Sequence, residues 1–415
     1  MNEEEVFTKK VPGDGGNQIE AKLNRQKVCH PWCTKKSSYY RLWLNLELMM
    51  PYLVECTIDN LRLEYNNKSR KTQNKQGVYT RVPGFGDTYS VEWLDSSSTK
   101  EVDYFATMVN YLVRRGLKRG VSIRGAPLDF RKAPKINAEF SGKIILKSLS
   151  TALVNVEGPI VTVTIGLEDE HQGYFGRLRK LIESTYGLNH NNRVVLICHS
   201  MGCPLTVTFL QTISQHWKDK FIKSFITLSA PFGGTVKSLR AIISGINLGS
   251  ITIRRLTIRK YMRSSPSVAY LLPLQRLWNS SEIVVQTPTK NYTVNDYKML
   301  FDDIDHPDSY ELWKDTRLFL KRQTPPGVET YCFHGSGIQT EEKLTYSDFF
   351  PDINPVIEYG DGDGTVNKRS LERCKEWSIL QKEQLIHKIF NQTTHADMMK
   401  DKNVLKLVYE IIQMS

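Results

Sequence analysis

The sequence predicts an α/β fold, in which the strands of a parallel sheet alternate with helices along the chain. Residues 194–199 form an apolar run of β-forming residues, and a predicted helix over residues 205–217 follows at once. An amphipathic helix over residues 104–115 precedes a predicted strand at residues 121–131, and residues 225–234 predict a further strand and turn. Repeated alternation of this kind is typical of a parallel sheet covered by helices.

Length and charge limit the classes of protein to consider. A chain of 415 residues can form one large domain with insertions, or two domains. The net charge of +12 indicates an acidic partner, either an anionic membrane surface or nucleic acid. The sequence has no zinc-finger spacing, RNA-binding sheet signature or basic heptad helix, so we expect a membrane surface and no nucleic acid. The acidic start lacks the apolar segment of a signal peptide, and no apolar run is long enough to span a bilayer.

Cysteines and glycosylation sequons favour an oxidising compartment. The sequence contains seven cysteines, and N-x-S/T sequons stand at Asn67, Asn279, Asn291 and Asn391. Neither a C-x-x-C pair nor a Cys/His cluster indicates a metal, so we expect no metal site.

The segment that follows residues 194–199 has the pattern of a nucleophile elbow. Ser200 lies between an apolar strand and a helix, with Gly202 two places on and Cys198 in place of the usual first glycine. A turn of this kind lifts the hydroxyl off the sheet, and the next N–H faces the oxygen that it attacks. The alternative is a serine that only caps the following helix.

A glycine-rich turn over residues 11–18 predicts the second oxyanion donor, because the loop after an early strand supplies a backbone N–H in serine hydrolases of this sheet type. Phosphate binding is the competing interpretation, but the loop lacks the Lys followed by Ser or Thr that it requires.

Residues 39–54, between Cys33 and Cys56, are unusually rich in large apolar side chains. A pinned loop of this composition could insert into a lipid surface, and a core helix is the alternative. The candidate membrane-contacting residues are Trp43, Leu44, Leu46, Leu48, Met49 and Met50.

Two later segments interrupt the alternation. Residues 140–172 contain a β-prone run that has no place in the predicted sheet. From residue 236 to about 330, basic residues and prolines replace the strand–helix pattern, which predicts a cap over the sheet before it resumes at residue 331.

Chain order limits the catalytic partners of Ser200. On sheets of this type the nucleophile is followed by an acid and then by a histidine. After the acidic turn only His387 and His395 remain, and His387 lies in an alternating apolar run typical of a strand. His395 is therefore the candidate base, whereas spacing alone does not decide between Asp361 and Asp363.

Long motifs in this order resemble the lecithin:cholesterol acyltransferase family, and within it the lysosomal phospholipase A2 branch. They include VPGDGGNQIEAKLN, LWLNLELMMP, IDNLRLEYN, RVPGFGDTYSVEWLD, HSMG, APFGG, QTPTKNYTVNDY, PPGVETYC and GDGDGTVN. The resemblance implies an α/β-hydrolase core with an inserted cap and a disulfide-pinned lid that binds membranes. The implied segments are residues 1–32 (oxyanion loop and start of the core), 33–80 (lid), 81–235 (core with the elbow and the atypical segment 140–172), 236–330 (cap) and 331–415 (end of the core).

Site residues follow from the same motifs. The resemblance places the nucleophile on Ser200, the acid on Asp363 and the base on His395. It implies oxyanion donors at the backbone N–H groups of Asp14 and Met201, with Thr365 close by. The implied disulfides are Cys33–Cys56 and Cys332–Cys374, which leaves Cys29, Cys198 and Cys203 free.

The implied activity is that of a calcium-independent serine phospholipase A and O-acyltransferase without a cofactor. Its expected partners are an anionic glycerophospholipid membrane surface and a lipid alcohol acceptor such as ceramide, and its expected location is the lysosome or the extracellular space, peripheral to a membrane. Alternatives are a sterol acyltransferase of the same family and a non-catalytic lipid-binding protein. Asp14 argues against the sterol enzyme, because the sterol-acylating branch has cysteine there, and a carboxyl beside the oxyanion predicts an acidic pH optimum.

This sequence departs from the family pattern at several positions. Polar residues 3–10 stand where the family has an apolar first strand, and residues 140–172 have no counterpart in the pattern. Gly15 replaces a leucine, Phe232 replaces a tryptophan, and the sequon at Asn391 precedes the candidate histidine instead of following it.

Overall fold

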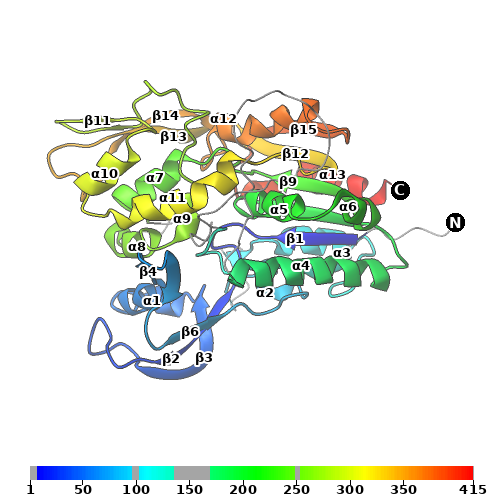
Figure 1. Cartoon of the computed structure of the whole chain (residues 1–415). Helices are drawn as coiled ribbons and strands as arrows, with labels where there is room; N and C mark the ends of the chain where they lie inside the picture. Colours follow the sequence, from blue (N-terminus) through cyan, green and yellow to red (C-terminus); the bar gives the residue numbers. More distant parts are fainter. Residues whose placement is uncertain (1–6, 96–101, 135–168, 248–252, 415) are drawn as a thin grey trace.

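The centre of the molecule is a six-stranded parallel sheet with the strand order β15-β12-β9-β8-β1-β7 (Figure 1). The computed structural model describes residues 7–95, 102–134, 169–247 and 253–414. The strands of this sheet are β1 (Phe7–Val11), β7 (Ile123–Gly125), β8 (Val194–His199), β9 (Ile222–Leu228), β12 (Glu329–Ser336) and β15 (Leu385–Asn391). The predicted α/β fold class is confirmed.

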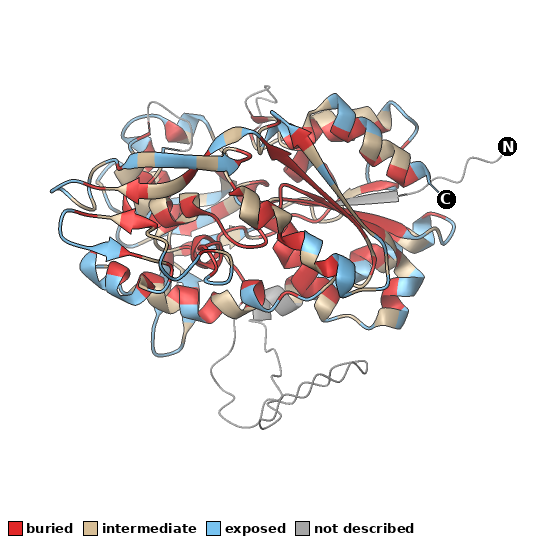
Figure 2. Ribbon diagram, turned by 90° about the horizontal axis from the view of Figure 1, so that it is seen from above, coloured by how far each residue is buried: buried red, intermediate tan, exposed pale blue. Residues whose placement is uncertain are grey.

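Helices cover both faces of this sheet, so strands β8, β9 and β12 are buried between two layers (Figure 2). Val195 and Ile197 on β8 pack in one apolar cluster with Met108 and Val408, whereas Leu196 packs in a second cluster on the opposite face. The first face is covered by α3 (Ala106–Val113) and α13 (Lys402–Gln413), the second by α4 (Asp169–Leu188), α5 (Gly202–Gln211) and α6 (Gln215–Phe221). The single helix predicted over residues 205–217 is thus wrong: it is two helices, and the Ser214 side chain caps the second by accepting from Trp217 N–H.

The first strand corrects another expectation. Residues 3–10 stand where an apolar first strand was expected, yet β1 forms over Phe7–Val11 and pairs in parallel with both β7 and β8. Ladder hydrogen bonds use backbone groups, so a polar sequence can occupy a central strand position. The predicted β-prone run at residues 159–165 lies outside the described residues, and α4 begins at Asp169, within the predicted segment 140–172.

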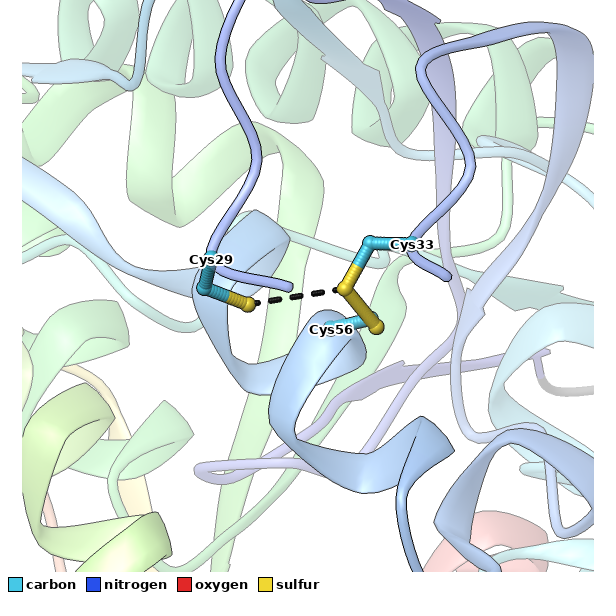
Figure 3. A group of neighbouring side chains, drawn as sticks. All are labelled: Cys29, Cys33 and Cys56. Carbon is cyan, nitrogen blue, oxygen red and sulfur yellow. Dashed lines mark hydrogen bonds between the residues drawn. A yellow bond between two sulfur atoms is a disulfide. The ribbon is translucent and has the colours of Figure 1, made fainter. Parts of the chain in front are cut away.

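A lid subdomain lies beyond one end of the sheet, at the lower left of Figure 1. It contains an antiparallel sheet of order β3-β2-β6 and a hairpin that pairs β4 with β5. Its elements are β2 (Ile19–Asn24), β3 (Lys36–Trp43), η1 (Glu47–Met49), α1 (Leu53–Leu61), β4 (Leu63–Asn66), β5 (Lys71–Asn74) and β6 (Val78–Arg81). The Cys33–Cys56 disulfide joins the segment before β3 to α1, and the free thiol of Cys29 lies 3.5 Å from Cys33 Sγ (Figure 3).

The lid exposes only part of the apolar run that was predicted to meet lipid. Trp43 and Met49 are buried in the main core, so their assignment as membrane-contacting residues is wrong. Trp43 ends β3, where its ring packs on Phe130 and its indole N–H donates to Gly15 O over 2.9 Å. Leu46 and Met50 are exposed, whereas Leu44 and Leu48 are half-buried.

The cap combines five helices with a small mixed sheet of order β11-β10-β13-β14. Its elements are α7 (Val236–Ile243), α8 (Arg255–Met262), α9 (Pro266–Tyr270), β10 (Val285–Gln286), β11 (Asn291–Tyr292), α10 (Tyr297–Asp303) and α11 (Asp308–Lys321), with β13 (Ile338–Thr345) and β14 (Val356–Gly362) from the C-terminal segment. Arg70 of the lid forms ion pairs with Glu311 and Asp315 on α11, which fixes lid and cap together. The five-segment division of the chain stays a prediction.

Short elements complete the fold around the ends of the sheet: α2 (Tyr89–Glu92), α12 (Lys368–Leu371), η3 (Glu372–Ile379) and η4 (Asp397–Met399). Both implied disulfides are present, since Cys332 on β12 is bonded to Cys374 on η3. The sequon asparagines are exposed at all four positions, namely Asn67, Asn279, Asn291 and Asn391. Within the described ranges, no helix combines the length and hydropathy needed to cross a bilayer.

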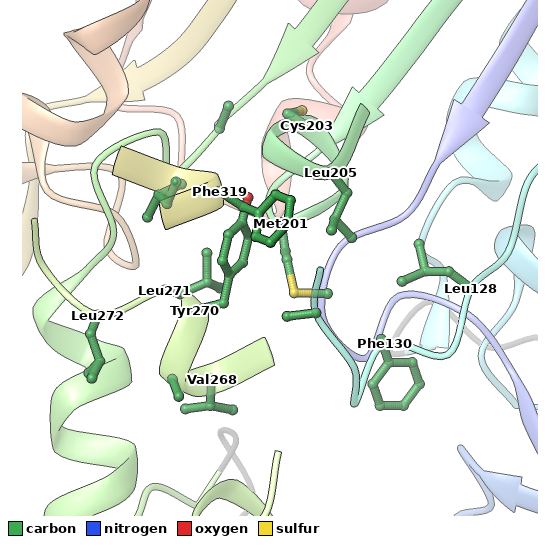
Figure 4. Packing of buried hydrophobic residues seen from close by; sticks show 14 of the residues in the cluster. Leu128, Phe130, Met201, Cys203, Leu205, Val268, Tyr270, Leu271, Leu272 and Phe319 are labelled. Atoms are coloured by element: carbon green, nitrogen blue, oxygen red, sulfur yellow. The ribbon is translucent and has the colours of Figure 1, made fainter. Parts of the chain in front are cut away.

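A hydrophobic cluster joins the core to the cap directly beside the elbow (Figure 4). Met201, from the turn after β8, belongs to this cluster together with Phe130 from the loop after β7. The cap contributes Tyr270 from α9 and Phe319 from α11. The elbow is therefore held by packing from the cap as well as by its own strand and helix.

Candidate active site

Ser200 occupies a strained turn between β8 and α5. Its φ is 53°, in the left-handed region that residues other than glycine seldom adopt. Its N–H donates to Leu228 O on the neighbouring strand over 2.9 Å, and its carbonyl accepts from Cys203 N–H over 3.0 Å. Strand, left-handed serine and helix are the backbone features of a nucleophile elbow.

Two glycines let the loop after β1 lie against this turn. A Cβ atom on Gly202 would stand 2.4 Å from Pro12 O, and one on Gly13 would stand 2.6 Å from Ser200 Cβ. Both distances are far below van der Waals contact, so a side chain at either position would push the loop away from the serine. The glycine-rich turn and the elbow thus form one unit, although the sequence separates them by more than 180 residues.

Cys198 and Cys203 form a disulfide, so the expectation that both are free thiols is wrong. The elbow reverses the chain sharply enough to bring their Cα atoms within 5.0 Å, a separation at which two cysteines can be bonded. Of the cysteines expected to be free, Cys29 alone keeps its thiol.

The candidate acid and base meet in the structure. Asp363, fully buried after β14, has Oδ2 2.8 Å from Nδ1 of His395. Its other oxygen accepts from the N–H groups of Thr365 and Val366, over 3.0 and 2.7 Å. The His395 backbone N–H also donates to Asp363 O, so the loop after β15 is tied to the acidic turn. The carboxylate therefore orients the imidazole through Nδ1 and leaves Nε2 free to accept a proton.

The charge on Asp363 is favoured despite its burial. Burial alone would raise the pKa of this carboxyl, but the His395 ring and the hydrogen bonds to the carboxylate hold the pKa below its usual value. Asp361, which spacing could not exclude, instead accepts from Gly337 N–H and pairs with Lys368 at 2.8 Å. Of the two aspartates, only Asp363 contacts the candidate base.

His199 connects the elbow to both flanking loops. Tyr104 accepts a hydrogen bond from Gly13 N–H over 2.9 Å, and its hydroxyl lies 2.6 Å from Nδ1 of His199. On the other side of the ring, Nε2 lies 3.0 Å from His395 O. Burial, together with the nearby His395 ring, lowers the pKa of His199 to about 3, so this imidazole is neutral and donates from Nε2 to the carbonyl. His199 and Tyr104 are positioning residues that sequence reasoning missed, because no local pattern marks partners 95 residues apart.

The ring of His199, the residue before Ser200, is tilted by 55° to the ring of His395, and the two ring centres are 4.7 Å apart. Among the described residues, Ser200 Oγ forms no hydrogen bond to the His395 ring. Catalytic hydrogen bonds are often longer in unliganded enzymes and shorten when the substrate binds.

The two N–H groups expected to bind the oxyanion remain available. In the part of the chain that the structure describes, neither Asp14 N–H nor Met201 N–H donates a hydrogen bond. Asp14 is exposed to solvent, yet desolvation of its carboxyl by the surrounding protein raises the pKa of this group to about 7, against the lowering effect of a hydrogen bond from Gly15 N–H. Thr365 lies at the acidic turn, where its carbonyl accepts from Thr235 and its hydroxyl accepts from Lys237 Nζ over 3.2 Å.

Comparisons with known proteins identify relatives of this chain. The family model described as lecithin:cholesterol acyltransferase matches residues 39–166, 163–316 and 312–402. The human protein named lysosomal phospholipase A and acyltransferase is 41% identical over 403 residues, which cover 97% of this chain and 89% of the relative. The chicken (Gallus gallus) phosphatidylcholine-sterol acyltransferase is 38% identical and covers 96% of this chain and 88% of its own.

A solved structure supports the fold. The crystal structure of the Tle4–Tli4 complex superposes with a TM-score of 0.51 over 99% of both chains, at 11% sequence identity. Identity this low is evidence for the architecture alone. The length and identity of the sequence matches, by contrast, confirm the relationship predicted from the motifs: the chain belongs to the lecithin:cholesterol acyltransferase family.

Proposed function

We propose that this chain is a serine phospholipase A and O-acyltransferase. The observation that carries the proposal is the hydrogen bond between Asp363 and His395 beside the strained turn of Ser200. The names of the relatives support the choice of a phospholipid as acyl donor. In this account His395 is the general base, Ser200 the nucleophile and Asp363 the group that orients and stabilises the imidazolium.

The first half-reaction forms an acyl-enzyme. His395 Nε2 takes the proton of Ser200 Oγ as the oxygen attacks an acyl ester of a glycerophospholipid. The negative oxygen of the tetrahedral intermediate accepts hydrogen bonds from Asp14 N–H and Met201 N–H. The ester bond then breaks, and the imidazolium returns its proton to the departing lysophospholipid.

The second half-reaction releases the acyl group by the same chemistry in reverse. His395 deprotonates either water, which gives a free fatty acid, or the hydroxyl of a lipid alcohol, which gives a transacylation product. Because the imidazole activates the hydroxyl, the proposed reaction does not require calcium.

Acceptor assays test this proposal. Phosphatidylcholine vesicles should yield free fatty acid in the presence of a calcium chelator, and vesicles that also contain ceramide should yield acylceramide, whereas vesicles that contain cholesterol should yield little cholesteryl ester. Mass spectrometry of the lipids measures all three products. Predominant cholesteryl ester would favour the sterol acyltransferase alternative, which the 38% identical chicken relative motivates. Vesicle binding without either product would favour a non-catalytic lipid-binding protein.

Replacing Asp14 with asparagine is expected to move the pH–rate profile toward neutrality. The pKa of Asp14 is raised to about 7, so the carboxyl is neutral below that pH and charged above it. A charged carboxylate beside the oxyanion loop opposes the developing negative charge, so the wild-type rate should fall as pH rises through about 7. Asparagine stays neutral and should remove this fall. An Asp361→Asn control should leave the profile unchanged, and an unmoved profile for Asp14→Asn contradicts the assigned role.

We also propose that the lid binds the membrane through an exposed apolar patch. This lid patch consists of Trp32, Leu46, Met50, Tyr52 and Leu53, which are 40–77% exposed. Trp32 donates to Tyr52 O over 3.2 Å, which joins the two ends of the patch across the Cys33–Cys56 disulfide. Aromatic and aliphatic groups on a basic protein suit the interface of an anionic bilayer.

Removing two side chains of the lid patch is expected to weaken vesicle binding. A Trp32→Ala, Met50→Ser double variant should bind anionic phospholipid vesicles about tenfold more weakly in a flotation assay. Each of these exposed apolar side chains is expected to be buried in the bilayer, and this burial contributes to the binding free energy. Ile379, which is 87% exposed on η3, provides the matched control Ile379→Ser. Equal losses in both variants would mean that the lid patch has no special role.

The names of the mammalian relatives support a lysosomal location for this chain. The exposed sequons and the disulfides support passage through an oxidising compartment on the way to the lysosome. An acidic working pH is also what the raised pKa of Asp14 favours.

A further inference from the structure

Two histidines face each other on neighbouring strands at the edge of the central sheet. In the β12–β15 register His387 lies opposite Cys332, and His334 follows Cys332 by two residues. Alternate residues share one face of a sheet, so both imidazoles project from the same side. Their Nε2 atoms are 2.8 Å apart.

A carboxylate joins this pair because a disulfide holds η3 over the same face. Cys332 is bonded to Cys374 on η3, and Glu372 lies two residues before that cysteine. One ligand atom each from His334, Glu372 and His387 lie within 4.8 Å of one another. Two neighbouring strands and a 3-10 helix thus bring two imidazole nitrogens and a carboxylate oxygen close together.

The hydrogen bonding of His334 leaves the right atom for a ligand. Its Nδ1 lies 2.8 Å from Gly335 O, and a carbonyl only accepts, so Nδ1 carries the proton. Nε2 is then unprotonated, with its lone pair directed toward His387. A backbone carbonyl that fixes the second nitrogen is the usual support of a metal-bound histidine. His334 is fully buried, whereas His387 is partly exposed and offers a path from solvent.

We propose that His334 Nε2, His387 Nε2 and the Glu372 carboxylate form a binding site for a divalent transition-metal ion such as Zn²⁺, with solvent as the fourth ligand. Two imidazoles and a carboxylate suit zinc, whereas calcium and magnesium prefer oxygen ligands alone. In tetrahedral zinc coordination two nitrogens stand about 3.3 Å apart, so the rings need to separate by about half an ångström. The partly exposed side chain of His387, on an edge strand, can make that movement.

The charges around the cluster are compatible with metal binding. The Nδ1 contact of His334 with Gly335 O leaves Nε2 of that ring unprotonated, as a metal ligand must be. Lys375 competes for the carboxylate, since its Nζ lies 3.0 Å from Glu372 Oε1. Asp363 adds negative charge nearby, because its carboxylate acts on His334 electrostatically.

The bound ion would connect the edge strand to the core next to the catalytic loop. His334 precedes Gly335, where an added Cβ would lie 1.8 Å from Thr393 O and 3.3 Å from Asp363 Cβ. The ion would therefore join β12, β15 and η3 beside the segment that carries His395, without touching Ser200. The expected consequence is higher stability of this end of the sheet, which a thermal measurement detects independently of activity.

Metal titration of the full chain tests the proposal. After treatment with a chelator and dialysis, wild-type protein should bind one Zn²⁺ at this site in calorimetry, gain a few degrees in Tm, and give the visible d–d absorption of four-coordinate cobalt when titrated with Co²⁺. His387→Ala and Glu372→Gln should each weaken zinc binding, the histidine variant by at least about 100-fold. The exposed His216 provides a matched surface control, and His216→Ala should bind like wild type.

A second control separates this site from the candidate active site, where another imidazole and carboxylate meet. His395→Ala should retain the zinc-induced rise in Tm and the cobalt spectrum. Loss of both in His395→Ala, with retention in His387→Ala, would place the ion at the active site and overturn the proposal. Equal zinc affinity in wild type, His387→Ala and Glu372→Gln would equally overturn it, and would leave the histidines as an N–H···N hydrogen-bonded pair.

Discussion

Replacing Asp363 with asparagine is expected to lower kcat for phospholipid hydrolysis about 10⁴-fold. Asparagine can still accept from the N–H groups of Thr365 and Val366, so its carboxamide oxygen takes the place of Oδ1. Its NH₂ group then faces His395 Nδ1, which must become an acceptor and move the proton of the ring to Nε2. An Nε2 that carries a proton cannot deprotonate Ser200, so the base is lost while the fold is kept.

The measurement for this prediction is kcat on phosphatidylcholine vesicles, with Tm recorded for each variant. Asp361→Asn is the matched control, because Asp361 lies two residues away and faces Lys368 instead of the imidazole. It should keep activity within about threefold of wild type, since its partners lie outside the proposed mechanism. If Asp363→Asn retained activity within tenfold of wild type, the orienting role of Asp363 would be wrong.

Replacing Ser200 with alanine is expected to lower kcat by about 10⁶-fold, because no acyl-enzyme can form without the serine hydroxyl. Binding to phospholipid vesicles should persist, since the lid patch is untouched. Ser229 provides the control: it also follows a sheet strand with positive φ, at 52°, but it is fully buried. Ser229→Ala should retain most of the activity, and loss of turnover in both variants with unchanged Tm would contradict the assignment of a single nucleophile.

The nucleophile elbow could be predicted from the sequence alone. The apolar run 194–199, the serine and the following helix identify an elbow, because strand, turn and helix are adjacent in the chain. Chain order then selected His395, and His387 lies within β15, as its alternating surroundings predicted. The choice of Asp363 over Asp361 needed the family motifs, since both aspartates have the same local sequence.

Contacts that depend on the path of the folded backbone could not be predicted from the sequence. The Cys198–Cys203 disulfide depends on how sharply the elbow reverses, which composition does not show. Trp43 was predicted to meet lipid, but the side of β3 on which it lies depends on packing against Phe130 and the oxyanion loop. The partners of His199 and His334 lie 95 and 53 residues away, so neither cluster has a sequence signature.

The most direct test of this account is the site at which a fluorophosphonate reacts. The probe should form one covalent adduct, which peptide mass spectrometry locates on Ser200, and labelling should disappear in Ser200→Ala and slow strongly in Asp363→Asn. An adduct on another residue, or the same rate of labelling in wild type and Asp363→Asn, would show that the imidazole and carboxylate do not activate this hydroxyl.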